Sequence, residues 1–516
     1  MASISEKMRI RMPVSAAVSV VLSAVLFLTV ENAVLYIPLV FIIPVATYAL
    51  SVERKNRKDD PRKLMNESPT VVGMMSSVIL SEGSLDSAVR YVSDNGPPIA
   101  KRMFKKVARE SDLRMSDVKE GLVAAVGNIH NDASPFKRSM HMLISSSETS
   151  DIGEKKRMIG DAENITLAGL KEMGDVYSSS LNNPCMMIFG LGVMIPMILM
   201  SVMPMLSMGG MFSVTALNTG TIGFLTLVVI PAIVSLVIVS IINNNPFHEK
   251  KVSSNNTFAV LFSAAPMFLV LYLFTKDPAM SLMISMIAAG ILTFAVTFKN
   301  VSEERVIQRT ETSLHHVFFE LGNRLLSGNN FEDSMIDALG TRKESLRLSG
   351  KFGRCVRLFR GDIVMSLRIT LKGYSEEIID GYVRVYKASC KDTRDSGRLS
   401  VSIGHQMQDR MQAKRNIRNK LKSITDMMTG TSIFFAPLIM GMSIVLLKPM
   451  ASISGMVVDG NVMLILAVYL IELALLLSVL TSYLSNNGDL NSVVNRFSIM
   501  MPAGLAVFAL FSGLNV

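Results

Sequence analysis

The charged residues of this 516-residue chain are gathered in two windows, and this distribution constrains the fold more than any motif does. Of the 94 Lys, Arg, Asp and Glu residues, 79 lie within 53–180 or 299–426, and the other 260 residues hold only 15. A soluble enzyme, a disordered chain and a disulfide-stapled secreted domain do not show such a division. The sequence therefore predicts a membrane protein with two hydrophilic domains.

The uncharged segments are long enough to cross a bilayer as helices, which takes about 20 mostly apolar residues. The first segment is longer than the core of a typical signal peptide, and a second follows it at once, so a retained hairpin is expected. The 73 residues of 176–248 carry no formal charge and are expected to hold two spans. The nine expected spans are Pro13–Val30, Ala33–Leu50, Pro184–Ser207, Thr221–Ile242, Thr257–Thr275, Pro278–Phe298, Met427–Leu447, Asn461–Ser485 and Phe497–Leu514.

Basic residues define the expected orientation through the positive-inside rule. Lys7, Arg9 and Arg11 place the N-terminus inside, and Lys250 and Lys251 require an even number of spans between 176 and 248. Both charged windows are then cytoplasmic, and the C-terminus lies outside. The net charge of +10 follows mostly from this topology, so it does not require nucleic acid as a partner.

The charge and hydropathy pattern divides the chain into five parts, and the expected fold class is all-α. Apolar residues in both windows recur at helical spacing, as in Phe136, Met140 and Leu143 or in the stripe from Val306 to Leu325. Each window is expected to form a bundle of about five or six helices. The parts are a transmembrane hairpin at 1–52, a helical domain at 53–180, four spans within 181–298, a second helical domain at 299–426 and three spans within 427–516.

Two short sequences recur at nearly the same spacing in the two windows, which indicates a tandem duplication. Leu80-Ser-Glu-Gly-Ser-Leu-Asp-Ser-Ala-Val89 corresponds to Leu326-Ser-Gly-Asn-Asn-Phe-Glu-Asp-Ser-Met335, at an offset of 246 residues. Glu148-Thr-Ser-Asp-Ile-Gly153 corresponds to Asp392-Thr-Arg-Asp-Ser-Gly397, at an offset of 244 residues. Two ordered matches at one spacing are stronger evidence than either match alone.

Each recurring sequence predicts a local structure. Gly83 and Asn329 are expected to turn the chain in a left-handed conformation, and Thr149 and Thr393 are candidate helix N-caps. Such residues are also common in turns that have no further role, and that alternative stays open at each position. The motif residues, among which Gly153 and Gly397 would allow close backbone approach, are Gly83, Ser84, Leu85, Thr149, Asp151, Gly153, Thr393, Asp395 and Gly397.

The tandem domains and these turns resemble a known family of membrane proteins. The turn with Leu80, Gly83, Ser84, Leu85 and Ala88 is similar to an L-x-x-G-x-S-L-x-x-A pattern of the type II secretion system F family, from which the second copy departs. The similarity is greatest to the archaeal TadC/FlaJ-like platform proteins of type IV pili and archaella, and it extends over nearly the whole chain. It implies a platform, with no catalysis of its own, that couples a cytosolic hexameric secretion ATPase to the insertion of pilin-like subunits. It also implies a homodimer.

Motifs for catalysis, a cofactor or a metal are missing from the sequence. It contains no GxxxxGK[ST] phosphate loop, no HExxH and no GxSxG elbow. His315 and His316 are adjacent, so they point in different directions on a helix and make a poor metal pair. The sequence therefore predicts a protein that is no enzyme and holds no cofactor and no metal.

Two groups of basic residues are candidates for binding an acidic partner such as the ATPase. The first is a stripe at i+4 spacing, which could instead anchor its helix on anionic lipid. The second lies away from any expected span, within a window of net charge +8 against +1 for the first window, although basic helices are often only solvated. The stripe is Arg410, Lys414, Arg418 and Lys422, and the cluster is Lys343, Arg347, Lys351, Arg354, Arg357 and Arg360.

Glu472 is the lone acidic residue well inside an expected span. A charge inside the membrane is costly and often functional, but a hydrogen bond from a Ser or Tyr of the bundle is an equally good explanation. A secondary transporter or channel built from a duplicated unit is the alternative function. A transporter would keep more polar groups at the midplane and has no need of two cytoplasmic domains of over 120 residues. A membrane enzyme is a third possibility that no motif supports.

Overall fold

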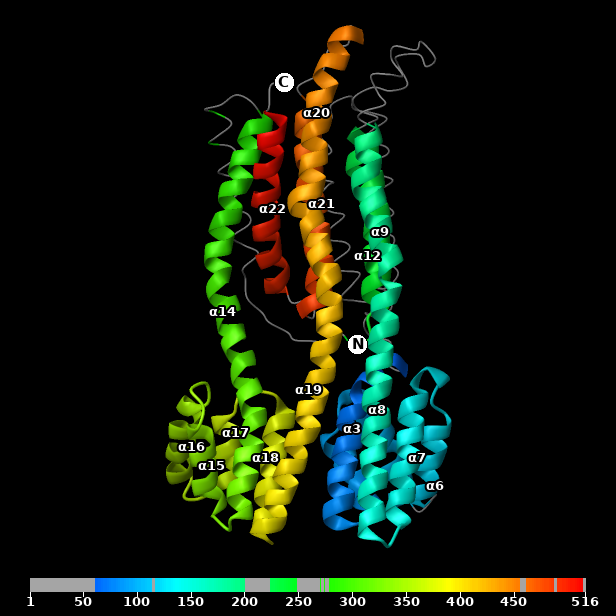
Figure 1. Ribbon diagram of the computed structural model, residues 1–516, viewed down its shortest axis with the longest axis vertical. Helices are drawn as coiled ribbons and strands as arrows, with labels where there is room; N and C mark the ends of the chain where they lie inside the picture. Colours follow the sequence, from blue (N-terminus) through cyan, green and yellow to red (C-terminus); the bar gives the residue numbers. More distant parts are fainter. Residues whose placement is uncertain are drawn as a thin grey trace. The chain divides into compact units, whose positions relative to one another are not determined.

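The computed structural model describes residues 61–113, 117–199, 223–247, 270, 273, 278–454, 461–486 and 490–513. Throughout these ranges the regular elements are helices and no strand forms, so the all-α class is confirmed (Figure 1). The chain divides into two compact units. The charged unit combines Lys58–Asp175 with Ser302–Ile417, and the apolar unit includes the described residues of Val176–Val301 and Arg418–Val516.

The first half of the charged unit is a bundle of six α-helices. They are α3 (Pro61–Glu82), α4 (Leu85–Asn95), α5 (Pro98–Asp112), α6 (Val118–Gly127), α7 (Ser134–Glu148) and α8 (Ile152–Ser180), with a 3₁₀ turn η3 (Asn131–Ala133) before α7. Gly96 and Pro97 separate α4 from α5, and Pro98 opens α5, where its missing N–H costs no helical hydrogen bond. These breaks let short helices fold back on one another.

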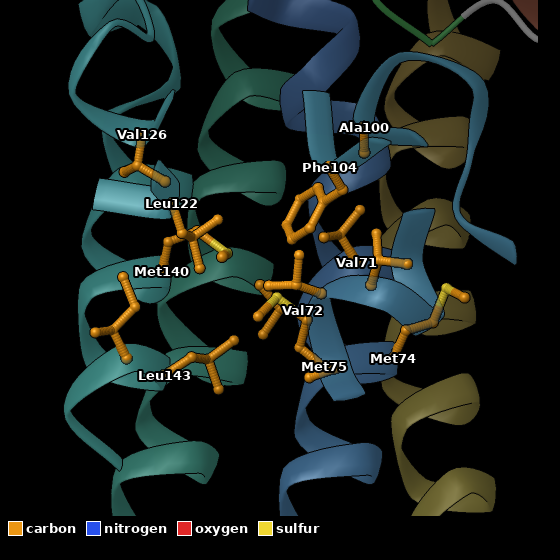
Figure 2. Close-up of a cluster of buried hydrophobic side chains, with 14 of the residues drawn as sticks. Val71, Val72, Met74, Met75, Ala100, Phe104, Leu122, Val126, Met140 and Leu143 are labelled. Atoms are coloured by element: carbon orange, nitrogen blue, oxygen red, sulfur yellow. The ribbon is translucent and has the colours of Figure 1, made fainter. Parts of the chain in front are cut away.

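The core of this bundle contains apolar side chains from α3, α5, α6 and α7. Figure 2 shows Phe104 of α5 pointing into the cluster that includes Val71 and Val72 of α3. Met140 and Leu143 of the expected apolar face on α7 are fully buried in the same cluster. Each such side chain contributes about 1.5–3 kcal/mol through its removal from water, which is the main stabilisation available to a bundle of short helices.

The second half of the charged unit is also a bundle of six α-helices. They are α14 (Pro278–Leu326), α15 (Phe331–Gly340), α16 (Leu346–Leu358), α17 (Ile363–Thr370), α18 (Glu376–Ser389) and α19 (Thr393–Gly430). Phe318 of α14 stacks on Tyr382 of α18 with 3.9 Å between ring centroids, and the Tyr382 hydroxyl donates to the Leu314 carbonyl at 2.6 Å. Val306 is 58% exposed, so its expected place in the buried stripe was wrong, because this core begins at Leu314.

The apolar unit consists of helices with three π-helical turns among them. Its further elements are α9 (Asn182–Phe189), η4 (Gly190–Met194), η5 (Leu225–Val229), α12 (Ile230–Asn243), η7 (Thr431–Phe435), α20 (Ala436–Ser454), α21 (Asn461–Asn486) and α22 (Leu490–Ser512), of which η4, η5 and η7 are the π turns. The described residues contain six helices long and apolar enough to cross a membrane, as expected of a membrane protein. The expected spans Pro13–Val30 and Ala33–Leu50 lie outside the described residues, as does Thr257–Thr275 apart from residues 270 and 273.

Three candidate spans belong to helices that also supply the charged unit. One helical run extends over Ile152–Leu199 and another over Thr393–Leu446, and α14 contains the span Ala279–Phe298. The expected domain limits at 298 and 426 fall inside α14 and α19, whereas the limit at 180 coincides with the end of α8, where a turn at Leu181 precedes α9 within the helical run Ile152–Leu199. At about 1.5 Å per residue, the 49 residues of α14 extend over about 74 Å.

Candidate partner-binding surface

Helix α16 carries most of the basic cluster opposite its buried side. Leu348, Phe352 and Cys355 recur at helical spacing and are buried, which fixes the rotation of the helix on the bundle. Arg347 and Arg354 lie on the other side and are exposed. The binary pattern of α16 therefore places the cluster at the surface.

Several residues of the cluster also bond within their own bundle. The Lys351 ammonium donates to the carbonyls of Ile369 and Thr370, both at 3.1 Å, and so satisfies the C-terminal end of α17. Arg354 and Arg357 each donate through Nε to a carbonyl one turn earlier, at 3.2 Å. Across the part of the chain that the structure describes, none of the six cluster residues lies within ion-pair distance of a carboxylate. The positive charge of the cluster is therefore not neutralised there.

The turn after α16 holds Arg360 in an uncommon backbone conformation. Its φ angle is 52°, in the left-handed region that costs a non-glycine residue about 1–2 kcal/mol. Gly361 follows with φ 87°, and its N–H bonds to the carbonyl of Val356 at 2.9 Å, which closes the end of α16. Glycine is the usual residue in the left-handed conformation, but here a non-glycine residue, Arg360, adopts it one position before Gly361.

Apolar side chains are exposed at both ends of α16. Leu346 is 56% exposed at the start of the helix, and Leu358 is 77% exposed at its end, followed by Phe359 at 36%. Positive charge next to exposed apolar area is typical of a surface that binds a partner, since aromatic and aliphatic anchors supply affinity and charges supply specificity. We call this the α16 surface, and it comprises Lys343, Leu346, Arg347, Arg354, Arg357, Leu358, Phe359 and Arg360.

The basic stripe on α19 has two parts with different surroundings. Arg410 forms an ion pair with Glu377 of α18, and both side chains are partly buried. Burial would raise the pKa of Glu377, but the charges of Arg410 and Lys414 outweigh it and hold the pKa below its usual value. Arg418 and Lys422 are exposed. The first two residues of the stripe thus support the bundle, and only the last two are presented to a partner or to lipid.

The first motif forms a left-handed turn in both windows, but at different positions. Gly83 has φ 70°, and the Ser84 hydroxyl caps α4, which starts at Leu85, by accepting the N–H of Ser87 at 3.3 Å. In the second window Gly328 adopts the positive φ of 87° in place of Asn329, so that expectation was wrong. A glycine has no Cβ to clash in this conformation, and one stands just before the predicted position.

The second motif caps a long helix in both windows, but through aspartate rather than threonine. Asp151 accepts two backbone N–H groups at the start of α8, at 3.1 and 3.3 Å, whereas Thr149 ends α7. Asp392 accepts two N–H groups at the start of α19, at 2.7 and 3.4 Å, and Thr393 is the first helical residue. Both threonine caps were wrong, because an aspartate with equal capping ability stands at the boundary that packing selects.

The two glycines of this motif differ in their surroundings. A Cβ on Gly397 would lie 2.8 Å from the carbonyl oxygen of Gly322 and 2.8 Å from the amide nitrogen of Leu326, so α19 and α14 cross in backbone contact. A Cβ on Gly153 would meet only the nearby Asp151 side chain at 3.6 Å, and close approach was wrong for that position. Asp395 lies exposed in the first turn of α19, where it accepts a hydrogen bond from Arg398 at 3.2 Å.

The two bundles of the charged unit share polar contacts that the sequence did not predict. Arg384 of α18 donates to the Ser77 hydroxyl at 2.7 Å and lies over the Tyr91 ring at 5.1 Å. Gln406 of α19 donates to Glu163 of α8 at 2.7 Å. Glu163 lies on the part of α8 that belongs to the charged unit, which ends at Asp175. Burial raises the pKa of Glu163 to about 7. Only positions that vary together among homologues could have revealed such pairs.

The adjacent histidines on α14 are engaged without a metal. His315 Nδ1 lies 3.3 Å from the Met407 sulfur, and burial lowers the pKa of His315 to about 4, so the ring is neutral at pH 7. Both histidines line a cavity of about 220 Å³ together with Phe319 and Arg415. The described residues contain no group of three or more His, Cys, Asp or Glu placed to hold a metal ion.

Comparison with known proteins adds no assignment to this geometry. No family model matches the chain, and neither a curated protein nor a solved structure matches it. The chemistry of the α16 surface and the membrane helices are therefore the features that bear on function.

Proposed function

We propose that this protein is the membrane platform of a type IV pilus-like or archaellum-like assembly or secretion machine. The observation that carries the proposal is that α14, α19 and the helix Ile152–Leu199 each contain both a candidate span and a part of the charged unit. A continuous helix resists bending far better than a loop, so force applied at one end reaches the other. A platform that transmits the movement of an ATPase to filament subunits needs such connections.

The proposed topology places both bundles of the charged unit in the cytoplasm, with the N-terminus inside and the C-terminus outside. The hexameric secretion ATPase then meets the charged unit, and pilin-like subunits meet the apolar unit. Arg418 and Lys422 lie where α19 passes from the charged unit to its apolar stretch, and they fit anionic lipid headgroups at that depth. The platform acts as a homodimer and has no catalysis of its own.

The α16 surface is the proposed contact for the ATPase. Its exposed leucines and Phe359 would bury apolar area, while its arginines and Lys343 would select an acidic face. Arg347 and Arg354 are the most useful residues to change, because both are exposed and neither pairs with a carboxylate among the described residues. Lys351 is less useful, because it also caps α17.

Binding of the purified full-length protein in detergent to the secretion ATPase of the same genome tests this proposal. The double variant Arg347→Glu and Arg354→Glu replaces two attractions with two repulsions of about 1 kcal/mol each, so Kd should rise by at least about tenfold. The matched control is Lys156→Glu with Arg157→Glu, two exposed residues of α8 in the other bundle. Wild-type binding should weaken as salt rises, because screening reduces the attraction.

The outcomes separate the platform from its alternatives. If the control weakens binding as much as the α16 variant, the contact lies elsewhere on the charged unit. If the wild-type protein binds no secretion ATPase and co-purifies with none from membranes, the platform proposal fails.

A secondary transporter built from a duplicated unit is the second candidate. Glu472 is the observation that favours it, because the side chain is 2% exposed within α21, as a carboxylate on an ion pathway would be. Proteoliposomes loaded with a pH-sensitive dye distinguish the two functions. A transporter would move protons together with a solute, and a platform would not change the internal pH.

A further inference from the structure

Glu472 lies near the middle of the most enclosed helix of the apolar unit. The candidate span on α21 is Val462–Ser485, and nearly every side chain in it is buried. Glu472 itself is 2% exposed. Within the described residues neither of its carboxylate oxygens accepts a hydrogen bond. An ionised carboxylate in this position would lose its hydration without gaining any described partner.

The hydrogen-bond donor nearest along the helix is used elsewhere. Tyr469 precedes Glu472 by one turn, and its hydroxyl donates to the carbonyl of Gly192 in η4. Two buried hydroxyls on neighbouring elements have no partner among the described residues, namely Thr226 in η5 and Ser432 in η7. Ser482 of α21 and the side-chain amide of Asn243 are also without a partner among the described residues. The unit therefore encloses a carboxyl group, three hydroxyl groups and an amide group that its described residues leave unsatisfied.

All three π turns lie beside α21, the helix that carries Glu472. A Cβ on Gly192 of η4 would lie 3.3 Å from Leu473, and one on Gly223, two residues before η5, would lie 3.4 Å from Ile465. A Cβ on Gly504 of α22 would lie 2.9 Å from the carbonyl oxygen of Ser432 in η7. Helix α21 packs against α22 and also contacts η5 and η7. Figure 1 shows α21 and α22 side by side.

Three π turns beside one helix are unusual, since π-helical turns are rare and are frequent at functional sites. A π turn widens the helix and shifts its hydrogen bonds, so one backbone carbonyl in each is left without its usual partner. Here the widened turns lie beside the helix in which an acidic side chain is buried. Simple packing of apolar helices would require neither feature.

No described charge lies close enough to neutralise Glu472. On α22, Arg496 donates to Ser485, which is thirteen residues or about 20 Å along α21 from Glu472. Asp426, before η7, is exposed. Tyr177 donates to the Ile241 carbonyl, and Cys185 lies seven residues before Gly192. The further titratable residues on these packed elements are Tyr469 and Tyr483 of α21 and, by sequence, Lys448 in the last two turns of α20.

We propose that Glu472 forms a protonatable site within the membrane, with a proton as its ligand and the three π turns as its walls. A carboxyl group that is buried without a counter-charge binds a proton in preference to remaining ionised. The neutral acid has one O–H donor, which an unsatisfied carbonyl or hydroxyl of the surrounding turns can accept. This site does not depend on the platform role, and it would exist in a transporter as well.

Infrared spectroscopy of the full-length protein in detergent tests the proposal directly, because a protonated carboxyl group has a C=O stretching band of its own. At pH 7 the wild-type protein should show a band that disappears in Glu472→Gln and moves to lower frequency in D₂O. Glu163→Gln is the matched control, since the pKa of Glu163 is about 7 and its band belongs to a different site. That variant should keep the Glu472 band.

Glu472→Asp keeps a carboxyl group and protects the test against a variant that fails to fold, and it should shift the band rather than remove it. Absence of any band that depends on residue 472, in wild-type protein with an intact helical amide band, would overturn the proposal. Loss of the band when sodium replaces a large organic cation would overturn the proton as the ligand and assign the site to sodium.

Discussion

The crossing of α14 and α19 at Gly322 and Gly397 gives the most direct prediction about how the charged unit holds together. A methyl group at residue 397 would lie 2.8 Å from both the Gly322 carbonyl oxygen and the Leu326 amide nitrogen. Both are backbone atoms, so no side chain can rotate away and the two helices must separate. Overpacking costs about 1–3 kcal/mol, and a clash with rigid backbone belongs at the upper end. Gly397→Ala should therefore destabilise the charged unit by about 3 kcal/mol.

A matched control is available on α16. A Cβ on Gly350 would have nothing within 4 Å, and the residue lies within a helix, where alanine is about 1 kcal/mol more favourable than glycine. For a unit of this size, 1 kcal/mol corresponds to about 2–4 °C in Tm. Gly397→Ala should lower Tm by about 6–12 °C, while Gly350→Ala should raise it by about 2–4 °C.

Thermal unfolding can be followed by a thiol-reactive fluorescent dye, because the chain contains buried free cysteines. Cys185 and Cys355 are buried and Cys390 is exposed, so a Cys390→Ser background removes the signal of the folded state. Dye labelling then rises as Cys355 of the charged unit becomes accessible. A Gly397→Ala protein that melts within about 2 °C of the wild type, or a Gly350→Ala protein that loses as much stability, would refute the backbone contact.

Two further changes should alter stability in a known direction. The raised pKa of Glu163 contributes stability that is fully present below about pH 4.5 and is lost as pH rises through about 7. The lowered pKa of His315 has the opposite effect, and its contribution to stability is lost as pH falls below about 6.5. Gln cannot ionise, so the free energy of unfolding of Glu163→Gln should match that of the wild type near pH 5, where Glu163 is protonated. At pH 8 it should exceed that of the wild type by up to about 3 kcal/mol. Circular dichroism melts across this pH range measure the difference. Arg360→Gly removes a side chain from a left-handed position and should raise Tm by about 2–4 °C, and a lower Tm would show that the arginine contributes packing.

The sequence predicted the helical class and the buried faces because these depend on periodic patterns. It placed helix starts less well, by two residues at Asp151 and by one at Asp392, because threonine and aspartate cap equally well and tertiary packing selects the boundary. It set the domain limits at 180, 298 and 426 by charge and hydropathy, and the last two lie inside the helices α14 and α19. Charge marks where a helix leaves the membrane, but only a turn or a proline marks where a helix ends.

The duplication stays a prediction, although the two bundles share more than the two motifs. Each contains six α-helices, and each has a left-handed glycine, Gly83 or Gly328, between its first two helices. The copies differ in net charge, which is +8 for the second window and +1 for the first, although α5 of the first bundle also carries five basic residues beside two acidic ones. That asymmetry is the reason for placing the ATPase contact on the second bundle.

Partners within the chain were beyond the reach of sequence reasoning. Of the ten basic residues singled out, Lys351 and Arg410 prove to bond to another helix of their own bundle, at α17 and at Glu377. A lysine that caps a helix and a lysine that awaits a partner look the same in a sequence. Spacing alone gives the face of a helix but not what lies opposite it, so the α16 surface could be located only after the bundle was known.

Glu472 shows how a structure decides between two explanations that a sequence leaves equal. A hydrogen bond from Tyr469 would have made the buried acid an ordinary packing residue, but that hydroxyl donates to the Gly192 carbonyl. The serines that follow it on α21 do not satisfy it either, since Ser478 donates to the Leu475 carbonyl and Ser482 has no partner among the described residues. Because no described donor bonds to the carboxyl group, its burial is favourable only if the group carries a proton. The acid is therefore better explained as a site than as part of the packing.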